Sequence, residues 1–109
     1  MGERKKRRDL YLPDAEMQAL TAKAKEQGRG AGNYVRHELA EWLKKLADDT
    51  IFGTSFVSLD VDRTPCGHEN RVKFGMTDID WFIFWDIKQA MKRPINSIIR
   101  AILRPGLGL

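Results

Sequence analysis

The feature that most constrains this chain is a strand-helix-helix pattern of about 37 residues, from Arg7 to Leu43, which is too small to fold alone. Leu10 and Leu12 alternate with polar residues, which predicts a short strand that ends at Pro13. Apolar residues then recur at helical spacing in two stretches that a glycine-rich turn separates. Chains below roughly 40 residues seldom bury enough apolar surface to be stable. The segment therefore needs a second unit of the same kind.

A second copy of the pattern begins 64 residues further along and runs from Arg71 to Leu107. Few residues are identical, so the repeat is one of pattern. The apolar positions Leu10, Leu12, Met17, Leu20, Ala31, Val35, Leu39 and Leu43 correspond to Phe74, Met76, Trp81, Phe84, Ile95, Ile99, Leu103 and Leu107. Two such units sharing one core predict an α+β protein, mostly helical, in which a short antiparallel β-ribbon lies on a four-helix core.

The chain divides into four segments by composition and pattern. We expect a basic arm at 1–6, a first unit at 7–47, a linker at 48–70 and a second unit at 71–109. The linker is longer than most connections in a small domain, so it should hold structure of its own.

An extra β-strand is expected in the linker, at 55–62, because Val57, Leu59 and Val61 alternate there with polar residues. This strand could pair with the strand at 71–76 as a hairpin. Alternatively, the strand at 71–76 could pair with the first unit's strand. We favour pairing between the two units, because their apolar faces then meet over a shared core.

Charge is concentrated at the start of the chain. The net charge is +4, and five basic residues stand in a row from Arg4 to Arg8. Such a run indicates a polyanionic partner, although a solvated tail has the same composition.

The only cysteine, Cys66, excludes an internal disulfide and is compatible with a reducing compartment. We find no secretory signal and no apolar run of about 18 residues, so we expect a cytoplasmic protein without a membrane partner.

Catalytic and metal-binding patterns are not evident in the sequence. Cys66 and His68 offer only two potential metal ligands, so neither a metal nor another cofactor is expected. No nucleophile motif, phosphate-binding glycine loop or paired carboxylate cluster stands out, so we do not expect an enzyme. The aspartates at 60, 62, 78, 80 and 86 are interpreted as solvated.

Both units resemble the ribbon-helix-helix family of DNA-binding proteins, the Arc/MetJ-like repressors. The resemblance rests on a strand ending at Leu12-Pro13, a helix ending at Gly28-Arg29 and a second helix after a four-residue turn. In the second copy, the segment from Arg93 through Asn96 and Ser97 is similar to the family's turn and helix start. Two copies in one chain are similar to the tandem forms among conjugative-plasmid accessory proteins and some viral regulators.

The resemblance implies a sequence-specific double-stranded DNA-binding protein, a transcriptional repressor or regulator, whose ribbon enters the major groove. The chain would act as an intrachain pseudo-dimer, and further assembly along DNA is left open. Bases would be read by the outward strand residues Arg7, Asp9, Tyr11, Arg71, Lys73 and Gly75. Phosphates would be bound by the arm, the turns and the start of each second helix, through Arg4, Lys5, Lys6, Arg29, Ala31, Gly32, Asn33, Arg93, Ile95, Asn96 and Ser97.

Some residues depart from the family's pattern. Asp9 places a carboxylate on the face that would meet DNA. Arg8 lies on the face that should be apolar, which we attribute to fraying of this edge strand into the basic arm. The run from Trp81 to Trp85 is apolar on more than one helix face. That excess keeps two alternatives open: a plasmid DNA-processing (relaxosome) accessory protein, and an antitoxin-like protein-interaction module.

Overall fold

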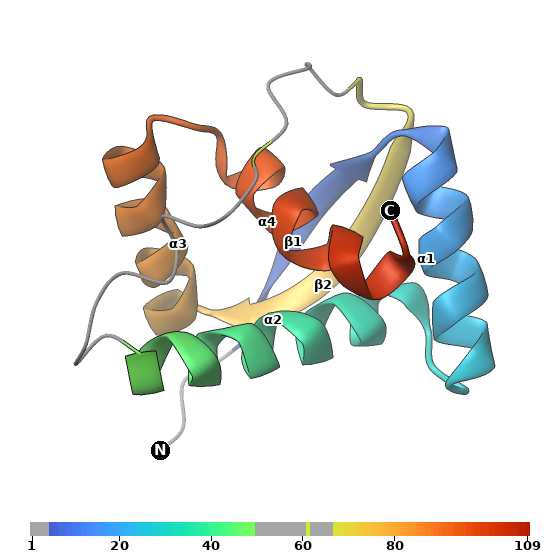
Figure 1. Ribbon diagram of the computed structural model, residues 1–109, viewed down its shortest axis with the longest axis horizontal. Coiled ribbons are helices and arrows are strands. Elements are labelled where there is room, and N and C mark those ends of the chain that lie inside the picture. Colours follow the sequence, from blue (N-terminus) through green and yellow to red (C-terminus); the bar gives the residue numbers. More distant parts are fainter. Residues whose placement is uncertain (1–4, 50–60, 62–66) are drawn as a thin grey trace.

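The computed structural model describes residues 5–49, 61 and 67–109 (Figure 1). The elements there are strand β1 (Lys5–Leu12), helices α1 (Asp14–Glu26) and α2 (Ala31–Asp49), strand β2 (Asn70–Thr77), helices α3 (Asp78–Met91) and α4 (Ile95–Leu103), and the 3-10 helix η2 (Arg104–Leu107). The predicted α+β class, mostly helical with a short antiparallel sheet, is confirmed for this part of the chain. None of the described helices combines the length and the apolar character that a membrane crossing needs.

Strands β1 and β2 form a two-stranded antiparallel sheet, which we call the ribbon. The pairing runs from Leu12 opposite Asn70 to Lys5 opposite Thr77. The pairing between the two units that the sequence favoured is therefore confirmed. Of the extra strand expected at 55–62, only Val61 is described, and Val61 is not in a strand. The rest of that segment lies outside the described residues.

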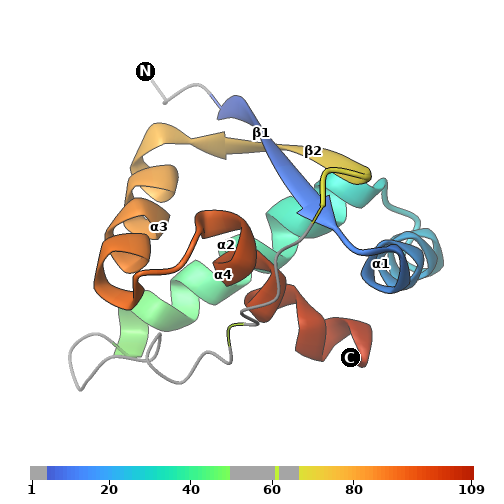
Figure 2. The same cartoon turned by 90° about the horizontal axis from the view of Figure 1, so that it is seen from above.

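The ribbon and the helices form two layers (Figure 2). In Figure 2 the strands run along the top. α2 and α4 pass beneath them, with α1 at one end of the molecule and α3 at the other. Side chains alternate with the two-residue period of a strand, so Leu10 and Leu12 of β1 and Phe74 and Met76 of β2 are buried against the helices. The opposite face of the ribbon has no described helix over it.

Each helix buries an apolar stripe beneath the ribbon. The side chains with almost no exposed surface include Leu20 of α1, Val35 and Leu39 of α2, Phe84 of α3, and Ile98 and Ile99 of α4. Trp42 of α2 stacks on Phe84, with 5.8 Å between ring centroids. All four helices and both strands contribute to one cluster of buried residues, so the two halves share a core.

The order strand, helix, helix occurs twice in the structure, and corresponding helices begin 64 residues apart. α1 begins at Asp14 and α3 at Asp78, while α2 begins at Ala31 and α4 at Ile95. This is the spacing that the apolar pattern of the sequence predicted. The two halves therefore present corresponding positions that can be compared directly.

Side-chain hydrogen bonds fix both ends of β2. At its start, the Asn70 amide donates to the Leu12 carbonyl at 3.0 Å and to the Asp14 carboxylate at 2.7 Å, which ties β2 to the junction of β1 and α1. At its end, the Thr77 hydroxyl accepts from the Asp80 N–H at 3.2 Å and caps α3.

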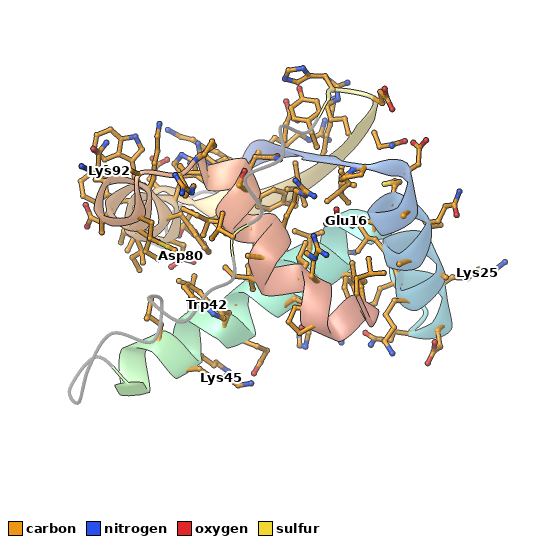
Figure 3. All side chains as sticks on the ribbon, turned by 45° about the horizontal axis from the view of Figure 1, so that its top comes forward. Glu16, Lys25, Trp42, Lys45, Asp80 and Lys92 are labelled. Atoms are coloured by element: carbon orange, nitrogen blue, oxygen red, sulfur yellow. The ribbon has the colours of Figure 1, made fainter. Side chains whose placement is uncertain are left out.

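A buried ion pair joins α1 to α4. Arg100 donates through Nε to Glu16 Oε1 at 3.2 Å and through Nη2 to Oε2 at 2.6 Å. Glu16 is 5% exposed and Arg100 3%. Figure 3 shows Glu16 on the side of α1 that faces α4. The pair could not be predicted from the sequence, because its members are 84 residues apart and neither shows a local signal.

Removing one member of this pair should cost more stability than removing both. Glu16→Leu leaves the Arg100 guanidinium unpaired in the core, and we expect a loss of about 3–5 kcal/mol in the free energy of unfolding. The double variant Glu16→Leu with Arg100→Met should recover most of that loss, because no uncompensated charge remains. Urea denaturation of the parent and the variants measures both effects. A double variant as unstable as Glu16→Leu would contradict this account.

Candidate nucleic-acid interface

The outer face of the ribbon carries all the residues that the sequence analysis assigned to base reading. Arg7, Asp9, Arg71 and Lys73 are exposed, and Tyr11 and Gly75 are half-buried. Across the ribbon, Arg7 lies opposite Gly75, Asp9 opposite Lys73, and Tyr11 opposite Arg71. Because three of these side chains are cationic and one is anionic, the face is positive.

These facing residues belong to the non-hydrogen-bonded pairs of the ladder. The side chain of Asn96, which lies on α4, bonds both main-chain groups of Tyr11: Oδ1 accepts from the Tyr11 N–H at 2.8 Å, and Nδ2 donates to the Tyr11 carbonyl at 3.0 Å. The peptide groups of Tyr11 therefore point away from β2. Alternation along the ladder puts Asp9 and Arg7 in the same class as Tyr11. Side chains approach most closely in such pairs, so the outer face presents a compact double row.

Asp9 is the acidic residue on this positive face. It stands directly opposite Lys73, where side chains of opposite charge attract each other across the strands. The positive charge of Lys73 therefore offsets the negative charge of the Asp9 carboxylate on this face. The departure from the family's pattern noted in the sequence is balanced locally.

Tyr11 marks one end of the double row and has an aromatic neighbour there. Its ring meets the ring of His68 edge to face, with 4.5 Å between centroids. His68 is exposed and precedes β2. From the sequence, His68 was considered only as a potential metal ligand, since nothing local links a residue in the linker to β1.

The N-terminus of α4 lies at the free edge of β1, where the two bonds from Asn96 hold it. The first helical backbone bond of α4 runs from the Ile98 N–H, at 3.1 Å. The N–H groups of Ile95, Asn96 and Ser97 precede that bond and have no acceptor within the helix. The sequence predicted a phosphate-binding role for Asn96, but it did not indicate that the Asn96 side chain bonds the backbone of Tyr11.

The N-terminus of α2 approaches the free edge of β2 in a different way. A Cβ atom at Gly32 would collide with the carbonyl oxygen of Lys73, so only glycine allows this approach. The first helical backbone bond of α2 runs from the Tyr34 N–H, at 3.0 Å. The N–H groups of Ala31, Gly32 and Asn33 precede it and have no acceptor within the helix.

The four helices differ in the charge of their first turns. Asp14 and Glu16 occupy the first turn of α1, and Asp78 and Asp80 that of α3, whereas the first turns of α2 and α4 contain no acidic residue. Acidic side chains neutralise the partial positive charge at a helix N-terminus. The two helices that begin at the ribbon edges keep this charge, so two unneutralised N-termini flank the positive face.

The basic segment at the start of the chain is partly within the ribbon. β1 begins at Lys5, so Lys6 belongs to a strand and not to a separate arm. Lys6 Nζ lies 3.0 Å from Asp78 Oδ2, and Arg8 Nη2 donates to Asp78 Oδ1 at 2.8 Å. Asp78, which the sequence analysis interpreted as solvated, is therefore an ion-pair partner. The hydrogen bonds from Lys6 and then from Arg8 lower the pKa of its carboxyl group.

Arg8 lies on the inner face of the ribbon, as its place in the alternation requires. Its guanidinium lies over the ring of Trp81, 4.6 Å from the centroid. An arginine that stacks on an aromatic ring and pairs with a carboxylate is accommodated among apolar residues. The sequence analysis had attributed this misplaced charge to fraying of the strand, which the pairing of Arg8 with Phe74 contradicts.

The remaining predicted phosphate contacts lie in the turns that precede α2 and α4 or outside the described residues. Arg29 is exposed, and Arg93 is half-buried and donates to the Lys92 carbonyl at 3.1 Å. Arg4, Cys66 and the side chain of Lys5 lie outside the described residues. In the part of the chain that the structure describes, no three side chains of histidine, cysteine, aspartate or glutamate gather as metal ligands would.

Comparisons with known proteins gave no match, whether against protein-family models, curated proteins or solved structures. Function is therefore inferred from the ribbon and from the helix N-termini at its edges.

The approach of α2 to β2 can be tested at Gly32. Gly32→Ala should lower the free energy of unfolding by about 1–3 kcal/mol, because the added Cβ must displace the backbone of Lys73. Gly30→Ser is the matched control, since a Cβ at Gly30 meets nothing within 4 Å and serine is a favourable residue before a helix. Thermal denaturation of both variants provides the comparison. Equal stability of Gly32→Ala and the parent would argue against the close approach.

Proposed function

We propose that this protein binds double-stranded DNA sequence-specifically, as a transcriptional regulator with two ribbon-helix-helix units in one chain. One observation carries the proposal: a two-stranded ribbon with a positive, uncovered face is flanked at each edge by a helix N-terminus without acidic residues. A two-stranded ribbon is narrow enough to enter the major groove, where base edges carry a distinguishable set of donors and acceptors.

The outer residues suit base edges by their chemistry. Arg7, Arg71 and Lys73 can donate to the acceptors of guanine, and Asp9 can accept from cytosine. Tyr11 offers a hydroxyl group and an apolar ring. Gly75 has no side chain, so the backbone can approach the floor of the groove beside it.

The helix N-termini suit phosphates on either side of the groove. Each offers free N–H groups and partial positive charge, and such contacts orient a protein on DNA without reading its sequence. The bonds of Asn96 and the close approach at Gly32 hold these N-termini against the strands. The two helix N-termini and the outer face of the ribbon therefore keep a fixed arrangement.

The two halves of the reading face differ, which bears on the kind of DNA site. Corresponding positions hold Arg7 and Arg71, then Asp9 and Lys73, then Tyr11 and Gly75. A homodimer presents the same residues to both half-sites. This chain should instead prefer a site with two unequal halves.

A second candidate function is a protein-interaction module, of the antitoxin-like or relaxosome-accessory type. It is favoured by the exposed apolar side chains of α3: Ile79 and Phe82 are 64% exposed and Trp85 45%. The ionic-strength dependence of binding distinguishes the two functions. Binding to DNA weakens steeply with added salt, by a log-log slope of about 0.9 per neutralised phosphate.

Base reading can be tested with Arg71→Ala and Lys73→Ala. Each variant should lose about 1–3 kcal/mol of discrimination at one base pair while its thermal stability stays near that of the parent, because both side chains are exposed. The preferred site is first selected from random duplexes by the parent and read by sequencing. Fluorescence anisotropy then compares that site with single-base variants of it.

Lys25→Ala is the matched control for the loss of one charge. Lys25 is exposed on α1 and points away from the molecule (Figure 3). It should leave base preference unchanged. If both ribbon variants discriminate among sites as the parent does, the ribbon does not read bases.

Phosphate binding by the N-terminus of α2 can be tested with Asn33→Asp. This variant adds a negative charge at the start of α2 with almost no change in shape. This charge favours the helix by about 0.3–1 kcal/mol but repels a phosphate at the same place. We therefore expect equal or higher thermal stability together with weaker binding to specific and random duplexes alike. The salt slope should fall by about 0.9 for one lost phosphate contact.

Gln18→Glu is the control for this charge change. It makes the same amide-to-carboxylate replacement at an exposed position of α1. Its DNA affinity should stay close to that of the parent. An Asn33→Asp variant that binds as tightly as Gln18→Glu would remove α2 from the phosphate-binding surface.

A further inference from the structure

The residues that correspond to the buried Glu16–Arg100 pair, 64 positions away in the sequence, do not form an ion pair with each other. Asp80 of α3 occupies the position that corresponds to Glu16, and Arg36 of α2 the position that corresponds to Arg100. Glu16 and Arg100 bond each other in two places. Among the described residues, no ion pair joins Asp80 to Arg36.

A cavity of about 300 Å³ lies between these two residues. It is bounded by α2, the end of β2 and the start of α3, and Figure 3 shows Asp80 on the side of α3 that faces α2. Its lining residues are Arg36, His37, Ala40, Leu43, Gly75, Met76, Thr77 and Asp80. The volume is at the lower end of the range for small-molecule sites, which is roughly 300–1,000 Å³.

Two substitutions between the halves account for the open space. Asp80 is one methylene shorter than Glu16, so its carboxylate does not reach across to the arginine of the facing helix. Ala40, a small residue that lines the cavity, stands at the position that corresponds to Arg104 in the other half. The backbone frame that holds a closed ion pair in one half therefore holds an open cavity in the other.

We propose that this cavity binds a small zwitterion with an apolar side chain, of the α-amino acid class. Arg36 supplies donors for a carboxylate, and Asp80 supplies acceptors for an ammonium group. Leu43 and Met76 provide an apolar wall for a side chain. The ligand would complete the charge pairing that Glu16 and Arg100 complete by themselves in the other half.

The arrangement selects against molecules with one charge. A carboxylic acid without an ammonium group would leave Asp80 without a cation and bring two anions together. An amine without a carboxylate would leave Arg36 unpaired. Such analogues are expected to bind more weakly, because each of them makes only one of the two charge-assisted contacts.

The variant Asp80→Glu tests this directly, because it rebuilds the closed pair. The longer side chain should reach Arg36 and occupy the ligand's place, as Glu16 does with Arg100. The cap at Thr77 uses the backbone N–H of residue 80, so it is retained. Asp86→Glu makes the same chemical change at an exposed position of α3 and serves as the control.

The experiment is isothermal titration calorimetry of the free protein with four probes: L-leucine, L-methionine, L-valine and L-phenylalanine. At least one probe should show saturable one-site binding below about 10 mM. Asp80→Glu should weaken it at least about tenfold, and Asp86→Glu should leave it unchanged. For the probe that binds, the analogue without the carboxylate and the analogue without the amine should each bind at least about tenfold more weakly.

Three results would overturn the proposal. They are the absence of saturable binding for all four probes, equal binding by Asp80→Glu and the parent, and equal binding of the single-charge analogues. Because no DNA is present, the outcome does not depend on the function proposed for the ribbon.

Discussion

The pairing of β1 with β2 is the contact on which the rest of the structure depends. A two-stranded ribbon is at best marginally stable alone in water, and a strand with two helices is too small to bury a core. Pairing solves both problems, because it brings Leu10 and Phe74 onto one inner face and places both helix pairs beneath it. Leu12 and Asn70, which face each other in the ribbon, are 58 residues apart in the sequence. The pairing therefore closes a long loop, and topology of that kind slows folding.

The edges of the ribbon connect stability to function. A strand edge exposes peptide groups that can pair with another chain, and proteins usually cover or charge such edges. Here Asn96 occupies the edge of β1 at Tyr11, and the backbone at Gly32 lies against the edge of β2 at Lys73. Each contact brings a helix N-terminus to the border of the outer face. The contacts that cover the edges therefore also place the two helix N-termini for which we propose phosphate binding.

Much of the backbone could be predicted because it leaves periodic signals. The alternation around Leu10 and around Phe74 identified both strands and their inner faces, and the 64-residue repeat favoured the correct pairing. The helix starts at Ala31 and Ile95 were approximately located by the glycine-rich turn and by the segment that follows Arg93. The outward phase of the candidate base-reading residues followed from the same alternation.

Side-chain partnerships were not predictable, because they join residues that are remote in sequence. Asp78 stands at a helix start, where an aspartate is expected in any case, so nothing local indicated that Lys6 and Arg8 would pair with it. Asn96 was assigned to a turn and helix start, and nothing near it in the sequence indicated that its side chain would bond Tyr11. A charged residue on an apolar face, such as Arg8, was the available signal of a buried partnership, and it was attributed to fraying instead.

Having two units in one chain allows the two halves to diverge, and the structure shows where they have. In a homodimer every residue must serve both ends, so a cavity and a closed ion pair could not occupy corresponding positions. Here Glu16 and Arg100 form a buried ion pair in one half. At the corresponding place in the other half, Asp80 and Arg36 line a cavity. The outer face diverges in the same way, since Asp9 in one strand corresponds to Lys73 in the other. Only the backbone frame has to remain symmetric, because the shared core and the strand pairing depend on it.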